Sequence, residues 1–91
     1  GMTAVRVPAV LRPSVGGQKE LEVGGGTVGE VIDGLIGQFP TLRDQLLAGD
    51  GELNRFVNVY VNGQDVRYLD GLATKVEPHD ELRLLPAMAG G

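Results

Sequence analysis

Apolar and polar residues alternate near the start of the chain, which is the pattern of half-buried β-strands. Val5 and Val7 alternate with smaller or more polar neighbours over residues 3–9, and residues 19–23 alternate again. The connection over residues 11–17 is rich in turn-forming residues. We therefore expect the two runs to pair as a hairpin with a long connection.

The spacing changes to that of a helix after the glycine triplet at residues 24–26. Thr27 followed by Glu30 is a capping box, which predicts a helix start at Thr27. One apolar stripe follows at helical spacing: Val28, Val31, Ile32, Leu35, Ile36 and Phe39. Pro40 ends this helix, and residues 41–47 are compatible with another short helical turn.

The second half of the chain predicts three more strands. Residues 56–61 alternate most strongly, and Asn62-Gly63 favours a two-residue type I′ turn that leads into a short strand over residues 64–67. Residues 81–85 alternate again and predict the last strand. Pro86 should end its ladder, because proline has no N–H to donate.

The element order ββαβββ predicts an α+β fold of the β-grasp type. A helix with a single apolar stripe covers one face of a mixed sheet and leaves the other face open. We expect the last strand to be central and residues 2–91 to form one domain, with a flexible tail at residues 87–91. Gly1 is interpreted as a remnant of tag removal.

The outward positions of the predicted strands suggest a partner-docking surface. Five residues should share the open face: Phe56, Tyr60, Arg6, Arg83 and Leu85. Aromatic residues and arginine are enriched among interface anchors. The alternative is that these side chains are ordinary solvated surface positions.

The residue inventory argues against an enzyme. The 91 residues include no cysteine, one histidine and one serine, so neither a catalytic triad nor a three-ligand zinc site can be assembled. His79 follows Pro78 and is interpreted as a solvated turn residue, and we expect no metal site.

The net charge of −4 disfavours a general nucleic-acid binder. Without a signal peptide, an apolar membrane span or a disulfide framework, we expect a cytoplasmic protein.

The sequence ends in Ala89-Gly90-Gly91, whose terminal carboxylate is the best candidate for a reacting group. Two glycines carry no side chain to block a narrow channel, so such a tail can enter the active site of another enzyme. We expect Gly91 to be the modified residue, and Gly90 and Ala89 to govern access. The alternative is that the terminal glycines simply fray.

Residues 71–82, together with Leu-Leu-Pro-Ala-Met-Ala-Gly-Gly at residues 84–91, resemble the C-terminal signature of the MoaD/ThiS family of ubiquitin-like sulfur carriers. Other matching segments are residues 11–13, 16–19, 55–58, 60–62 and 65–67. The sequence is similar across its whole length to the CysO branch of this family, which serves cysteine biosynthesis.

The resemblance implies a reaction at Gly91. In this family an E1-like enzyme consumes ATP to adenylate the terminal glycine, and sulfur then displaces AMP to give a thiocarboxylate. In the CysO branch the sulfide goes to an aminoacrylate on a PLP-dependent cysteine synthase, and a JAMM-type metalloprotease later frees cysteine. The chain would then be a protein cosubstrate without a bound cofactor.

Other functions would use the same tail. A ubiquitin-like modifier would be joined to lysines through Gly91, and other carriers supply sulfur for molybdopterin, thiamin or thiolated secondary metabolites. A plain binding module with an idle tail is a further alternative. The sequence does not separate these functions.

Overall fold

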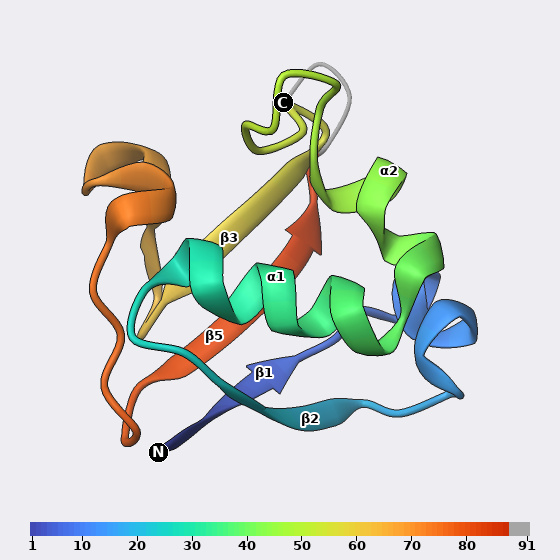
Figure 1. The fold of residues 1–91 in the computed structure, drawn as a ribbon, viewed down its shortest axis with the longest axis horizontal. Helices are drawn as coiled ribbons and strands as arrows, with labels where there is room; N and C mark the ends of the chain where they lie inside the picture. Colours follow the sequence, from blue (N-terminus) through green and yellow to red (C-terminus); the bar gives the residue numbers. More distant parts are fainter. Residues whose placement is uncertain (88–91) are drawn as a thin grey trace.

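The structure is a computed structural model that describes residues 1–87. Its five strands form one sheet in the order β2-β1-β5-β3-β4 (Figure 1). The strands are β1 (Met2–Arg6), β2 (Glu20–Gly24), β3 (Val57–Val61), β4 (Gln64–Asp65) and β5 (Glu81–Pro86). β5 is parallel to β1 and antiparallel to β3. The predicted ββαβββ β-grasp order with a central last strand is confirmed.

Helix α1 (Val28–Gln38) lies across one face of this sheet (Figure 1). The shorter helical elements are α2 (Arg43–Leu46) and the 3₁₀ turns η1 (Ala9–Val15), η2 (Pro40–Leu42), η3 (Val66–Tyr68) and η4 (Gly71–Ala73). The Thr27 hydroxyl accepts from the Glu30 N–H at 3.2 Å, and the Glu30 carboxylate accepts from the Gly26 N–H at 2.7 Å. The predicted cap therefore forms, although Glu30 reaches one residue further back than in the usual capping box.

The apolar stripe of α1 packs onto the inward side of the sheet. Its members Val28, Val31, Ile32 and Leu35 are buried, while Ile36 and Phe39 are partly buried. They join one core cluster with Val5, Val59 and Leu84, as the spacing predicts. Burying a Val or Leu side chain stabilises a fold by about 1.5–3 kcal/mol, so this contact holds the glycine-containing helix in place. No helix within residues 1–87 is long and apolar enough to cross a bilayer.

Two strands end well before the predicted residue, and the bounds of β2 and β3 differ from the prediction by one residue. β1 stops at Arg6 rather than at residue 9, although the Val7 N–H still donates to the Lys19 carbonyl at 2.8 Å. β4 contains only residues 64 and 65, because the Asp65 carboxylate accepts from the Arg67 N–H at 2.8 Å and starts η3. Asn62-Gly63 has positive φ at both residues, 49° and 85°, as a type I′ turn requires.

The prediction that Pro86 ends the ladder is wrong. β5 continues through Pro86, which pairs with Val57, and the Ala87 N–H donates to the Phe56 carbonyl at 2.9 Å. Alternate residues of a strand hydrogen-bond to opposite neighbours. The nitrogen of Pro86 therefore faces the side of β1, whose pairing with β5 has already stopped at Arg83. No donor is needed there, and the proline is tolerated.

Candidate functional site

Three of the predicted docking residues form a row across three strands. Arg6 of β1 pairs with Arg83 of β5, and Arg83 pairs with Tyr60 of β3. Paired residues share a face of a sheet, and this face lies opposite α1. Leu85 lies one row closer to the tail, opposite Asn58. We call Arg6, Tyr60, Arg83, Leu85 and Phe56 the docking strip, and its role in partner binding stays a prediction.

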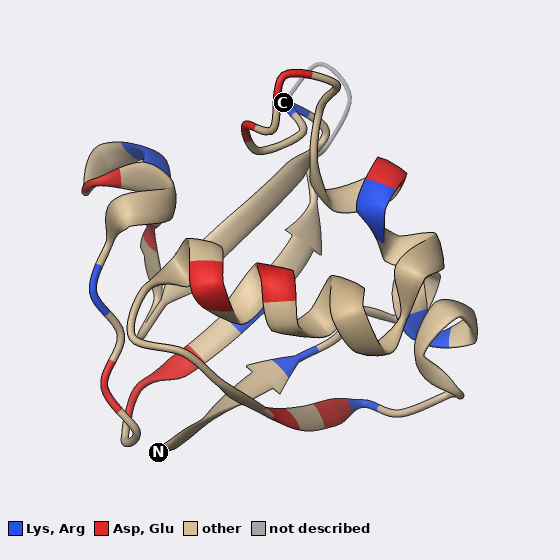
Figure 2. Ribbon diagram, in the orientation of Figure 1, with Lys and Arg blue, Asp and Glu red and all other residues tan. Residues whose placement is uncertain are grey.

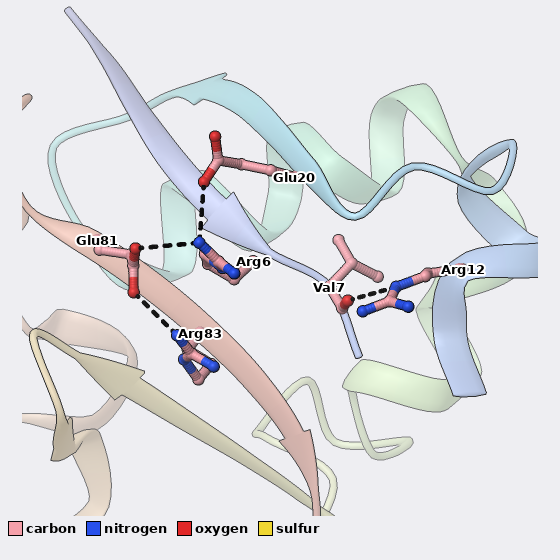
Figure 3. A network of polar contacts seen from close by, with 6 residues as sticks. All are labelled: Arg6, Val7, Arg12, Glu20, Glu81 and Arg83. Atoms are coloured by element: carbon pink, nitrogen blue, oxygen red, sulfur yellow. Dashed lines mark hydrogen bonds and ion pairs between the residues drawn. The ribbon is translucent and has the colours of Figure 1, made fainter. Parts of the chain in front are cut away.

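Two carboxylates orient the arginines of the docking strip (Figure 3). An Arg6 guanidinium nitrogen lies 3.7 Å from a Glu20 oxygen and 4.0 Å from a Glu81 oxygen. Arg83 approaches the other oxygen of Glu81 at 3.4 Å. These side chains are about half exposed, so each pair contributes about 0–1 kcal/mol to stability. The contacts therefore orient the guanidinium groups and contribute little to the fold.

Phe56 lies at the base of the tail. Its side chain is 64% exposed, and its carbonyl accepts the hydrogen bond from Ala87. The guanidinium carbon of Arg55 lies 4.9 Å from the Phe56 ring centroid, a cation–π distance. A large apolar ring is thus exposed beside Ala87, the last described residue before the terminal glycines.

The predicted tail residues Ala89, Gly90 and Gly91 lie outside the described residues. Their roles in access and modification stay predictions. The strand before them is firmly held, because Leu82 and Leu84 of β5 are buried in the core. The described chain therefore ends directly after the central strand of the sheet.

His79 and Asp80 form part of a turn. The His79 ring is 83% exposed, and its Nε2 lies 3.6 Å from an Asp80 oxygen. The Asp80 carboxylate accepts from the Glu77 backbone N–H at 2.8 Å and from the Asn62 amide at 2.7 Å. These hydrogen bonds, the backbone one most, lower the pKa of Asp80. Within residues 1–87 no group of three or more candidate metal ligands occurs.

Sequence reasoning missed a basic pocket beside the docking strip. This pocket of about 260 Å³ lies where β1 runs into η1, and its charged lining residues are Arg6, Arg12, Lys19 and Arg83. In Figure 2, basic positions lie at the end of β1, in η1 and just before β2, and acidic positions lie on α1 and β2. Arg12 and Lys19 fall in or beside an irregular connection. The alternation of apolar and polar residues does not predict the path of such a connection. The segments that resemble the sulfur carriers, residues 11–13 and 16–19, were the only sequence signal for them.

The chain matches the ThiS family over residues 5–91. It is 44% identical over 89 residues to the sulfur carrier protein CysO of Mycobacterium tuberculosis, with 96% of each chain covered. It is 40% identical over 65 residues to small archaeal modifier protein 3 of Haloferax volcanii, a match that covers 71% of this chain and 70% of that one.

Solved structures agree in fold. A chain in the crystal structure of the Amycolatopsis orientalis BexX/CysO complex superimposes with a TM-score of 0.88 at 42% identity, covering 98% of this chain and 99% of that one. The expected resemblance to the MoaD/ThiS sulfur carriers and the ubiquitin-like β-grasp fold are thereby confirmed. The chain belongs to the ThiS family.

Proposed function

We propose that the chain is a sulfur carrier whose Gly91 carboxylate is adenylated by an E1-like enzyme and converted to a thiocarboxylate. The carboxylate oxygen attacks the α-phosphate of ATP and releases pyrophosphate. A sulfur nucleophile then displaces AMP from the acyl group. The thiocarboxylate donates its sulfide to an acceptor in cysteine biosynthesis.

The strand that precedes the tail carries this proposal. β5 is the central strand and is paired on both sides, so the described chain ends at Ala87 directly after a firmly held strand. Five residues reach roughly 17 Å when fully extended, which is enough to enter a pocket of a partner. The match to the ThiS family extends over Gly90 and Gly91, and the relatives named above include proteins called sulfur carriers.

In this proposal the chain is a cosubstrate of its partner enzymes rather than a catalyst. It binds no cofactor of its own, and the activating enzyme consumes the ATP. A PLP-dependent cysteine synthase receives the sulfide, and a JAMM-type metalloprotease frees the product. Because activation needs ATP, the proposal also places the carrier in the cytoplasm.

Intact-mass measurement tests the proposal. The chain is incubated with the activating enzyme of its host, ATP and a sulfide source, and the intact masses of the products are measured by mass spectrometry. We expect the mass change of one oxygen replaced by sulfur, located at Gly91. A chain without Gly91 is the matched control. An unchanged mass, with an activating enzyme that is active on another carrier, would contradict the proposal.

Protein modification is a second candidate, favoured by the likeness to the archaeal modifier protein. It uses the same activation but ends in a bond between Gly91 and a lysine of a target. The same reaction with host extract distinguishes the two, because a modifier gives lysine-linked adducts. Addition of a purified cysteine synthase to the thiocarboxylate tests cysteine against the molybdopterin, thiamin and secondary-metabolite pathways.

A further inference from the structure

The basic pocket is unusual in a chain of net charge −4. Of the residues that line it within the described part of the chain, four are cationic and none is acidic. The other lining residues are apolar, and the accessible ones among them are Pro8, Ala9 and Leu85, because Val7 and Leu84 are buried. The pocket therefore offers positive charge and apolar surface side by side.

Arg12 is oriented in this pocket by a backbone contact. Its Nε donates to the Val7 carbonyl at 3.0 Å (Figure 3). A guanidinium carries five N–H donors, so the terminal nitrogens of Arg12 remain available for a ligand. Among residues 1–87, no carboxylate lies within 4.0 Å of the cationic groups of Arg12 or Lys19. These two cations are therefore not neutralised by the carboxylates that orient Arg6 and Arg83.

We propose that this pocket binds an acidic side chain of the activating enzyme, presented on a segment that also carries an apolar residue. Arginine and a carboxylate form short, charge-assisted and often bidentate hydrogen bonds. A small hydrated anion such as phosphate would leave the apolar surface of Pro8, Ala9 and Leu85 exposed to water. A peptide covers both parts of the pocket, so burial of apolar surface adds to the ionic contact.

The location of the pocket supports this occupant. Leu85 belongs both to the pocket wall and to the docking strip, and it lies two residues before Ala87. An enzyme that draws the tail into its active site approaches the chain on this side of β5. An anchor at the base of the tail would fix the direction in which the tail leaves. The inference rests on the proposed function and adds the chemistry of the partner surface.

Titration of the full chain with short peptides tests the pocket without any enzyme. The probes are acetyl-Leu-Glu-Leu-Asp-amide, its neutral analogue acetyl-Leu-Gln-Leu-Asn-amide, and inorganic phosphate. Binding of each probe is measured from the shifts of the amide NMR signals of the isotope-labelled chain. We expect the acidic peptide to shift residues 6–12, 19 and 83–85 and to bind about tenfold more tightly than either other probe. Equal or tighter binding of phosphate would replace the proposal with a small-anion site. Equal binding of the neutral peptide, or no shift at these residues, would overturn it.

Variants assign the effect to the cations. Arg12→Gln and Lys19→Gln should each weaken binding of the acidic peptide about tenfold, whereas Arg43→Gln and Lys75→Gln remove exposed cations outside the pocket and should change nothing. Arg12→Gln also removes the hydrogen bond to Val7 and disturbs η1. Lys19→Gln breaks no side-chain hydrogen bond or ion pair within residues 1–87. Weaker peptide binding by this variant would therefore be due to the lost positive charge and not to a disturbed structure.

Kinetics with the activating enzyme separates the two proposals. Lys19→Gln should raise the KM for the carrier about tenfold with little change in kcat, because the anchor acts in binding. If the wild type forms thiocarboxylate and this KM does not move, the pocket proposal fails and the carrier function stands. If the wild type is never activated, the carrier function fails, while the peptide titration still decides what the pocket binds.

Discussion

The two faces of the sheet are built from alternate residues of the same strands, and β5 shows the contrast. Leu82 and Leu84 face α1 and are 0% and 1% exposed, whereas Leu85 on the other face is 37% exposed. The covered face forms the core with α1, and the open face carries the docking strip and borders the basic pocket. A change on the covered face should therefore alter stability, and a change on the open face should alter partner binding.

Removal of the terminal residue should have the largest effect on function and the smallest on folding. Deletion of Gly91 moves the carboxylate by roughly 3.5 Å, whereas reacting atoms must approach within about 3–3.5 Å. Gly90→Val adds a β-branched side chain at the expected entrance. Both variants should lose adenylate and thiocarboxylate formation and keep the wild-type melting temperature.

ATP–pyrophosphate exchange with the activating enzyme, measured beside thermal denaturation, tests both halves of this prediction. Full exchange by the chain without Gly91 would remove the basis for the carrier function. A large drop in melting temperature would instead mean that the tail belongs to the folded core.

A pair of leucines on β5 tests the contrast directly. Leu84→Ala leaves a cavity in the core and should lower the free energy of unfolding by about 2–5 kcal/mol. Leu85→Ala, one residue away on the open face, should change it by about 0.5 kcal/mol or less. Urea denaturation measures both values. Equal losses would show that both faces are part of the core.

Substitutions in the docking strip should weaken binding without unfolding the chain. Phe56→Asp or Arg83→Glu should cost about 2 kcal/mol of binding to the activating enzyme, or roughly 30-fold in Kd. Tyr68→Asp and Arg43→Glu change exposed residues outside the strip and serve as matched controls. Calorimetric titration gives the affinities. If the Phe56 and Arg83 variants lose cooperative melting, these side chains are structural and the docking hypothesis is wrong.

Alternation predicted both faces correctly because side chains in a strand repeat every two residues. It placed Leu82 and Leu84 in the core and Arg83 outside before the strand neighbours were known. The error at Pro86 arose because the need for an N–H depends on where β1 ends, which is a tertiary fact. Arg12 was missed for the same reason: only the path of η1 brings it beside Arg83.

Two glycines of α1 show another limit of the sequence. Gly34 and Gly37 should each weaken the helix by about 1 kcal/mol relative to alanine. In the structure a Cβ on Gly34 would lie 2.9 Å from a methyl group of the buried Val23, whereas a Cβ on Gly37 would meet nothing within 4 Å. Gly34 therefore permits the close approach of α1 to β2, and Gly37 has no such role.

Alanine at these two positions should have opposite effects. Gly37→Ala should stabilise the fold by up to about 1 kcal/mol. Gly34→Ala gains the same propensity but forces Val23 to move, at a typical cost of about 1–3 kcal/mol for overpacking, so its net effect should be destabilising. Thermal denaturation compares them. Stabilisation by both substitutions would show that β2 yields easily and that α1 is loosely packed.

Asp80 fixes the turn that leads into β5, and its replacement should have a small effect on stability that depends on pH. Its pKa is lowered in the folded state by hydrogen bonds from Glu77 and Asn62. The stabilisation is therefore complete above the ordinary aspartate pKa of about 3.9 and is lost as the pH falls through the folded value. Asp80→Asn should cost about 0.5–1.5 kcal/mol at neutral pH.

The difference between Asp80→Asn and the wild type should shrink as the pH falls below about 4, because protonation neutralises the same carboxylate in the wild type. Urea denaturation at a series of pH values measures it. Asp33→Asn, on the exposed side of α1, is the control, and it should show no comparable convergence. A difference that stays constant down to about pH 3 would mean that the amide disturbs the turn by its shape. The negative charge of Asp80 would then contribute nothing to the turn that leads into β5.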